Sequence, residues 1–286
     1  MARPDIAAPG GAPLAASAVP PVSGPRFSRE PLVSVHAQRR DAQGEHPVRE
    51  SLAAEVPVAM QYNSRPHAVM LASPADLEDF AFGFALTEGI IGAVAELTLV
   101  DRVWSEHGIA LQMLIPAQRF LALSSRDRNL TGRTGCGLCG TATLEAAIRP
   151  VNHVNPAGMR ADTRAVLEGM ERLAALQPFN AATGAVHAAA LLTEENGFTV
   201  REDVGRHNAI DKAVGAVMRA GARPHSLLVT SRASYDVVHK AAQVGCRLVA
   251  AISAPTSLAL RLAQEAGVTL VGWTRAARMT VYCGRL

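Results

Sequence analysis

The second half of the chain repeats one pattern three times: a short apolar strand, a polar loop and an amphipathic helix. Units of this kind fold into a largely parallel sheet, with the loops gathered at the carboxyl ends of the strands. Each loop leads into a helix N-terminus, where unpaired N–H groups and the helix dipole favour a bound anion. The repeat therefore predicts an α/β fold with an anion-binding edge. The strands are predicted at 198–200, 226–229 and 247–252, and the helices at 208–219, 235–244 and 258–266.

The loops of the three units carry hydroxyl, imidazole and guanidinium groups that are suited to a phosphate. One polar loop of this kind is explained by helix capping alone, but three in series favour a ligand that bears phosphates. The residues concerned are Arg206 and His207 in the first loop, Thr230, Ser231, Arg232 and Ser234 in the second, and Thr256 and Ser257 in the third.

The first half of the chain is predicted to be rich in β-structure. Residues 1–28 are mainly Ala, Pro, Gly and Ser, and we expect them to form a disordered tail. Alternating apolar residues predict a series of hairpins and strands. These are a hairpin over 31–48 with its turn at 38–45, a second hairpin from 55–62 and 67–72, and strands at 97–104, 109–115 and 119–124.

One helix interrupts these strands. Ser73 is a suitable N-cap, Pro74 fits the first helical position, and Gly89 follows an apolar stripe that begins at Leu77. Further along the chain, helical patterns occur at 141–148 and 162–176, and strands are predicted at 186–192, 268–272 and 279–282.

Composition narrows the class of protein. A chain of 286 residues with 49% hydrophobic content can bury a substantial core, and small aliphatic side chains must fill it because only 4% of residues are aromatic. The net charge is +3, four cysteines are too few for a disulfide scaffold, and no apolar run reaches membrane-spanning length. The start of the chain also lacks the pattern of a signal peptide. We expect a cytoplasmic protein that binds neither nucleic acid nor membranes.

The stretch Thr134-Gly135-Cys136-Gly137-Leu138-Cys139-Gly140 has the most distinctive chemistry of the chain. Two thiols lie three residues apart, and the glycines around them leave the sulfur atoms unshielded. Arg126, Arg128 and Arg133 precede the pair, and positive charge favours thiolate over thiol. This setting suits sulfur chemistry better than it suits packing.

Three familiar kinds of site fit this stretch poorly. A dinucleotide-binding glycine motif should follow a strand directly, but ten mostly polar residues intervene. A structural zinc site needs four ligands, and we expect Cys246 and Cys283 to be buried apolar side chains instead. A zinc deaminase needs a His-x-Glu or Cys-x-Glu motif, which the chain lacks. We therefore expect no metal site.

Two functions of the thiols remain open: disulfide exchange, and carriage of sulfur as a persulfide. A redox Cys-x-x-Cys normally opens a helix directly after a strand, whereas this pair follows a polar loop. A glycine-flanked loop suits a thiol that must visit first a donor and then an acceptor. The pair of thiols alone does not decide between the two functions.

Several stretches of the chain resemble one known family, the FdhD family of formate dehydrogenase accessory sulfurtransferases. They occur in family order and cover the chain from about residue 30 to its C-terminus. The stretches are Ala72–Phe80 with Gly83, Thr87–Ile91, Thr134–Gly140, Arg201–Lys212, Thr230–Tyr235, Ile252–Leu258 and Thr269–Arg275.

The resemblance implies a fold, a reaction and a set of partners. The fold would be a cytidine deaminase-like mixed sheet with flanking helices, plus a smaller N-terminal β-rich part, in a homodimer. A cysteine desulfurase would supply sulfur to Cys136, with Cys139 assisting. The sulfur would pass to molybdenum in the bis-molybdopterin guanine dinucleotide cofactor (bis-MGD), which formate dehydrogenase needs for its activity.

The resemblance also implies where the cofactor binds. The bis-MGD segment maps onto Trp273, Thr274, Arg275, Ala276, Ala277 and Arg278, and the guanine-nucleotide pocket maps onto the region from Thr230 to Ser234. We add His207, from the first polar loop, to the cofactor-binding candidates. His187 and His207 are also candidate proton shuttles, with a structural hydrogen bond as the alternative for each.

The chain departs from the family pattern at three places. Ala276 stands where the family usually has Gly, and the stretch from Thr183 to His187 replaces a Thr-Gly-Gly-x-His-like sequence. The chain also ends without the common His-Pro-x-Arg, which leaves Cys283 without a family role.

The leading hypothesis is a sulfurtransferase for the molybdenum cofactor, with a persulfide intermediate on Cys136. Its rivals are a chaperone that delivers the cofactor without transferring sulfur, and a thiol–disulfide oxidoreductase. We divide the chain into four parts accordingly. They are the tail (1–28), the N-terminal β-rich part with one helix (29–130), a mobile Cys-x-x-Cys loop and connector (131–160) and the α/β cofactor-binding part (161–286).

Overall fold

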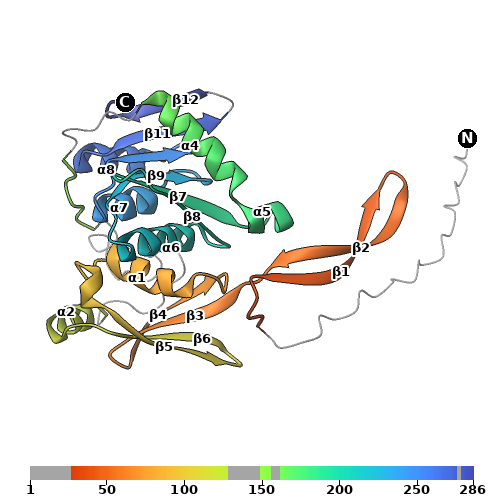
Figure 1. The fold of residues 1–286 in the computed structure, drawn as a ribbon, viewed down its shortest axis with the longest axis horizontal. Helices are drawn as coiled ribbons and strands as arrows, with labels where there is room; N and C mark the ends of the chain where they lie inside the picture. The colour runs from red at the N-terminus through yellow and green to blue at the C-terminus, as the bar shows by residue number, and fades with distance from the viewer. Residues whose placement is uncertain (1–26, 128–148, 156–161, 276–277) are drawn as a thin grey trace, which may run out of the picture.

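The computed structural model describes residues 27–127, 149–155, 162–275 and 278–286. Helices and strands alternate within these ranges, so the predicted mixed α/β class is confirmed (Figure 1). The predicted tail, the two thiols of the Cys-x-x-Cys pair, the predicted helix at 141–148 and residues 276–277 lie outside the described residues. No described helix is long and apolar enough to cross a membrane. The cytidine deaminase-like topology and the four-part division stay predictions.

The largest sheet has six strands in the order β12-β11-β10-β9-β7-β8. Its three central strands, β9, β10 and β11, are parallel, as the repeated units predict. Strand β7 pairs antiparallel with both β8 and β9, so β8 runs in the same direction as the parallel strands. The carboxyl ends of β8, β9, β10 and β11 therefore lie along one edge. The strands are β7 (His187–Thr193), β8 (Phe198–Asp203), β9 (Pro224–Val229), β10 (Leu248–Ala251), β11 (Thr269–Arg275) and β12 (Arg278–Cys283).

Helices cover both faces of this sheet, and Figure 1 shows α6 and α1 between it and a second sheet. Alternation along β7 explains why both faces are apolar: Ala188 and Ala190 pack toward α4, whereas Ala189 and Leu191 pack toward α6 and α7. The covering helices are α4 (Thr163–Ala175), α6 (Arg206–Arg219), α7 (Tyr235–Gln243) and α8 (Ser257–Ala266), whereas the short helix α5 (Pro178–Thr183) has no buried residues.

The second sheet has four strands in the order β4-β3-β6-β5, and α1 packs on one of its faces. Helices α1 and α6 cross with their backbones in contact, since a side chain at Gly83 or Gly215 would overlap the backbone of the other helix. The elements are β3 (Val56–Tyr62), β4 (Arg65–Ala72), α1 (Leu77–Thr87), the 3-10 turn η1 (Val94–Glu96), β5 (Thr98–Ser105), β6 (Gly108–Leu114) and α2 (Ala117–Asp127).

A separate hairpin precedes these elements, formed by β1 (Leu32–Asp41) and β2 (Gly44–Ala53). It projects from the body of the molecule (Figure 1). The predicted hairpin at 31–48 is thus confirmed, although its second strand continues farther, to Ala53. The predicted turn at 38–45 is too long, because the strands pair as far as Asp41 and Gly44 and leave only residues 42 and 43 between them.

Two sequence-based predictions in this half are wrong. Residues 119–124 are not a strand but part of α2, in which Phe120 and Leu123 contact the core at helical spacing and Leu121 is 69% exposed. Ser73 is not the N-cap of α1 and Pro74 is not its first residue, because the helix begins at Leu77 after Asp76. The Ser73 hydroxyl instead accepts a hydrogen bond from the Val204 N–H at 3.2 Å, a long-range contact that replaces the local cap.

Candidate functional site

The polar loop between β9 and α7 is the centre of the candidate site. Thr230 is held against β7, because its N–H donates to the Ala188 carbonyl (3.1 Å) and its hydroxyl accepts from the Ala188 N–H (2.9 Å). The Ser231 hydroxyl donates to the Arg232 carbonyl (3.0 Å), while the Arg232 side chain is exposed. These bonds fix the path of the loop from the sheet to the helix.

Ser234 ends this loop and is the N-cap of α7, but its hydroxyl makes no capping bond. The residue is only 8% exposed, and among the described residues its Oγ has no hydrogen-bond partner. A buried hydroxyl without a partner is costly, and the N–H groups at a helix N-terminus favour an anion. Ser234 and the N-terminus of α7, which we call the anion site, therefore fit a phosphate.

The start of α6 adjoins the start of α7. His207 Nε2 lies 3.6 Å from Asp236 Oδ2, and both side chains are about 10% exposed. Burial alone would raise the pKa of Asp236, but His207 beside it holds that pKa below its usual value. Burial also lowers the pKa of His187, and the charges of Arg206 and His207 add to this effect. His187 therefore remains neutral at neutral pH.

Backbone contacts join the loops at this edge. Ala233 forms a parallel bridge with Pro255, and its carbonyl accepts from the Thr256 N–H (2.9 Å). Thr256 in turn caps α8 by accepting from the Ala259 N–H (3.3 Å). The loop after β9 and the loop after β10 thus form one continuous edge.

The end of β11 continues this edge. Trp273 adopts the left-handed region, with φ of 54°, and its N–H donates to the Ser253 carbonyl (3.2 Å). Thr274 donates to the Ala251 carbonyl (2.7 Å), so it is a structural anchor in this structure. Arg275 lies over the Trp273 ring and pairs directly with Arg278 across the hairpin. Two cations facing each other repel, and a bound anion would relieve that repulsion.

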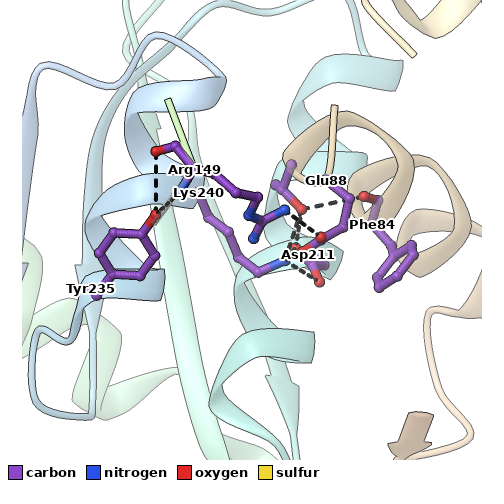
Figure 2. Close-up of polar contacts among 7 residues, drawn as sticks. Phe84, Glu88, Arg149, Asp211, Tyr235 and Lys240 are labelled. Atoms are coloured by element: carbon purple, nitrogen blue, oxygen red, sulfur yellow. Dashed lines mark hydrogen bonds and ion pairs between the residues drawn. The ribbon is translucent and has the colours of Figure 1, made fainter. Parts of the chain in front are cut away.

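A buried ion network lies beside α7, at the point where the described chain resumes after the thiol stretch. Arg149 is the first residue there, and its guanidinium donates to Glu88 Oε2 (2.7 Å). Lys240 of α7 donates to Glu88 Oε1 (3.0 Å) and to Asp211 Oδ1 (2.8 Å). Figure 2 shows these charges converging from α1, α6 and α7. The network ties three helices to the returning chain.

The charges in this network stabilise one another. Burial alone would raise the pKa of Glu88, but Lys240 and Arg149 hold it well below its usual value. Burial alone would lower the pKa of Lys240, but Asp211 and Glu88 hold it above its usual value. Glu88 and Lys240 therefore remain charged at neutral pH.

Tyr235, the first residue of α7, binds the backbone of the same returning segment (Figure 2). Its hydroxyl accepts from the Arg149 N–H (2.8 Å) and donates to the Arg149 carbonyl (3.3 Å). Its ring stacks on His239, with 5.7 Å between ring centroids. Burial, helped by the nearby Arg149 charge, lowers the pKa of His239 to about 4.

The structure places most of the predicted cofactor residues along one edge of the six-stranded sheet. They are His207, Thr230, Ser231, Arg232, Ser234, Trp273, Thr274, Arg275 and Arg278. The remaining candidates lie outside the described residues, so their roles stay predictions. They are Cys136, Cys139, Ala276 and Ala277.

The two cysteines outside the pair differ in burial. Cys246 is fully buried, as predicted, and burial raises its pKa to about 12. The prediction that Cys283 is buried is wrong: it lies on the edge strand β12 and is only partly buried, and its thiol donates to the Val268 carbonyl (3.4 Å). Within the described ranges, no three His, Cys, Asp or Glu side chains gather as a set of metal ligands.

Sequence patterns did not predict the network of Glu88, Arg149, Asp211, Tyr235 and Lys240. One signal was available: the only two lysines of the chain, Lys212 and Lys240, both stand among apolar residues of predicted helices. A lysine in such a position requires a buried carboxylate partner.

Comparisons with known proteins agree with the resemblance seen in the sequence. A curated relative from Cupriavidus necator, "Sulfur carrier protein FdhD", is 48% identical over 240 residues, which cover 82% of this chain and 82% of that protein. A relative of the same name from Xanthomonas euvesicatoria pv. vesicatoria is 49% identical over 240 residues, covering 82% and 84%.

A solved structure shares the fold. It is the crystal structure of a protein assigned as a formate dehydrogenase accessory protein in Desulfotalea psychrophila. It matches 88% of this chain and 97% of its own, with a TM-score of 0.66 and 23% identity. The FdhD/NarQ family model matches residues 53–286. The chain therefore belongs to the FdhD/NarQ family.

Proposed function

We propose that this protein is a sulfur carrier in the maturation of formate dehydrogenase. Cys136 takes sulfur as a persulfide from a cysteine desulfurase, and the sulfur is passed to the molybdenum of bis-MGD. The observation that carries the proposal is the buried, unpartnered hydroxyl of Ser234 at a helix N-terminus, in a chain whose relatives are named sulfur carrier proteins. A cofactor that bears phosphates supplies the partner that this hydroxyl lacks among the described residues.

The first step is a displacement at sulfur. The Cys136 thiolate attacks the terminal sulfur of a persulfide on the desulfurase. The donor's S–S bond breaks, the donor cysteine leaves as a thiolate, and a new S–S bond forms on Cys136. No external oxidant or reductant is needed, because the sulfur atom keeps its oxidation state.

The second step releases the sulfur. The Cys139 thiolate attacks Sγ of Cys136, the terminal sulfur leaves as hydrosulfide for the metal, and a disulfide forms between the two cysteines. The two electrons come from the pair of thiols, so an external thiol must reduce the disulfide before the next cycle.

The described residues would bind the cofactor that accepts the sulfur. The Ser234 hydroxyl and the N–H groups of α7 would bind one phosphate of bis-MGD, and Arg275 with Arg278 would bind another. His207 is held by Asp236 near the same edge, where it is placed to move a proton. By the family resemblance, we expect the protein to act as a homodimer in the cytoplasm.

Intact mass after incubation with a cysteine desulfurase and cysteine tests the proposal. A persulfide predicts a gain of about 32 Da on the peptide that contains Cys136. A chaperone that transfers no sulfur predicts no adduct, and an oxidoreductase predicts a loss of about 2 Da as a disulfide forms.

Replacement of the thiols gives the cellular test. Cys136→Ala should abolish formate dehydrogenase activity in cells that depend on this protein, whereas Cys139→Ala should leave part of it if other thiols can release the sulfur. Cys246→Ala is the matched control, because its buried thiol is unreactive. Normal maturation with Cys136→Ala would show that the persulfide role is wrong.

A further inference from the structure

We infer that Tyr235 is a positioning residue for the transfer of sulfur, an inference that rests on the proposed function. Its hydroxyl binds both backbone polar groups of Arg149, the residue at which the described chain resumes after the thiol stretch. Its neighbour in sequence, Ser234, forms the anion site. One helix end thus holds the acceptor's phosphate and also fixes the chain that returns from the thiols.

Chain connectivity makes this attachment relevant to the thiols. Arg149 follows Cys139 by ten positions in the sequence. Ten residues span at most about 35 Å when fully extended, so the position of Arg149 limits where Cys139 can lie. A tether of this length raises the effective concentration of the thiols near its anchor, so a fixed attachment point favours transfer to a cofactor bound beside it.

The attachment is rigid because Arg149 is held at three points. Its N–H and carbonyl bind Tyr235, and its guanidinium binds Glu88 at the end of α1. Lys240, one turn and a half along α7 from Tyr235, binds the same carboxylate. The side chain and the backbone of Arg149 are therefore both fastened to helix α7, directly or through one shared ion.

Loading of sulfur and delivery of sulfur should respond differently to the loss of the Tyr235 hydroxyl, whereas a general loss of stability would reduce both. Loading takes place where Cys136 meets the desulfurase, which is a separate protein, so it does not depend on the distance from the thiols to the anion site. Delivery to the cofactor does depend on that distance. Loss of the Tyr235 hydroxyl should therefore slow delivery and leave loading unchanged.

The test is Tyr235→Phe, which removes one oxygen atom and keeps the ring that stacks on His239. Tyr282→Phe is the matched control, since no described residue hydrogen-bonds to the Tyr282 hydroxyl. Three quantities are measured: the persulfide adduct after incubation with a desulfurase and cysteine, formate dehydrogenase activity in cells with equal amounts of each variant, and hydrogen exchange of the Arg149 amide.

We expect Tyr235→Phe to be loaded like the wild type, while formate dehydrogenase activity falls about fivefold to tenfold, in keeping with the loss of two hydrogen bonds. The Arg149 amide should also exchange faster. Tyr282→Phe should match the wild type in all three measurements.

Three outcomes would overturn the inference. If Tyr235→Phe is loaded and supports normal activity, the hydroxyl does not position the thiols, and the proposed function still stands. If loading and activity fall together, Tyr235 has only a structural role. If the wild-type protein takes up no sulfur from the desulfurase, the proposed function itself is wrong and the inference fails with it.

Discussion

The two lysines of the chain are both buried, in two ion clusters that contact the same helix. Lys212 of α6 pairs with Asp203 Oδ2 (2.6 Å), and its ammonium lies 5.8 Å from the ring centroid of Phe80. Lys240 of α7 pairs with Asp211, and its ammonium lies 5.7 Å from the ring centroid of Phe84. The two phenylalanines are one turn apart on α1, so the clusters have similar surroundings.

The clusters differ in what they hold. The Lys212 cluster is closed: the lysine is fully buried, and Asp203 also accepts from Ser73, Gly205 and Asn208. It locks the turn between β8 and α6 against the segment before α1. The Lys240 cluster is open, because one of its four members, Arg149, has a side chain that is 30% exposed and follows the thiol stretch.

This difference suggests two uses of the same chemistry. A closed ion pair with every polar group satisfied fixes a single arrangement of elements that are already adjacent. The open network joins helices to a segment outside the regular elements. We therefore expect changes in the Lys212 cluster to affect mainly stability, and changes in the Lys240 cluster to affect stability less and sulfur delivery more.

The largest predicted effect compares Lys212→Met with Lys240→Met, which remove each ammonium and keep a similar volume. Lys212→Met leaves Asp203 buried and without a cation, which should cost about 4 kcal/mol of the free energy of unfolding. Lys240→Met also leaves a buried carboxylate, Asp211, without its cation. Burial already raises the pKa of Asp211, so this carboxylate can take up a proton, and Arg149 still neutralises Glu88. The expected cost is therefore lower, about 2 to 3 kcal/mol. Urea unfolding at pH 7 measures both values. Equal costs, or a larger cost for Lys240→Met, would contradict the contrast.

The second prediction concerns the pH dependence of stability that is due to His239, which lies beside the Lys240 cluster. Burial lowers the pKa of His239 to about 4, whereas the unfolded chain should titrate near the ordinary value of 6.5. The unfolded state therefore binds a proton first as the pH falls. Stability due to neutral His239 is fully present above pH 6.5 and is lost progressively toward pH 4, with a loss of about 2 kcal/mol at pH 5.

His239→Phe tests this, since a phenyl ring can stack on Tyr235 and cannot take up a proton. The loss of stability between pH 7 and pH 5, measured by urea unfolding, should be smaller than in the wild type by about 2 kcal/mol. His107→Gln, at an exposed position, is the control and should leave the wild-type slope unchanged. An unchanged slope with His239→Phe would show that His239 is not the titrating group.

These clusters also show what the sequence could and could not predict. The strands of the six-stranded sheet were predictable because apolar runs such as 226–229 are bounded by polar loops, and the direction of the strands then placed the loops on one edge. The predicted anion-binding loop at Thr230–Ser234 followed from that local pattern. The residues that hold this loop against the rest of the molecule could not be predicted from that pattern.

The failures at Ser73 and at the ion network have one physical cause, which is that distant partners override local patterns. Ser73 is a good N-cap by sequence, but the Val204 N–H, 131 residues away, takes its hydroxyl. The members of the open cluster stand at positions 88, 149, 211 and 240, and the packing of α1, α6, α7 and the segment that begins at Arg149 brings them together. No periodicity in the sequence records such a contact.

The smallest predicted effect compares one hydroxyl in each cluster. Thr87 donates to Asp211 (2.6 Å) and accepts from Lys240 (2.9 Å), so Thr87→Val removes two hydrogen bonds to charged groups and should cost about 1.5 kcal/mol. Ser73→Ala removes one bond to a neutral N–H and should cost about 0.7 kcal/mol. Combined with Lys240→Met, Thr87→Val should cost less than the sum of the single changes, whereas Ser73→Ala should be additive. Additive costs are expected because the two clusters are independent. If the cost of Ser73→Ala combined with Lys240→Met differs strongly from the sum of the single costs, the two clusters form a single network.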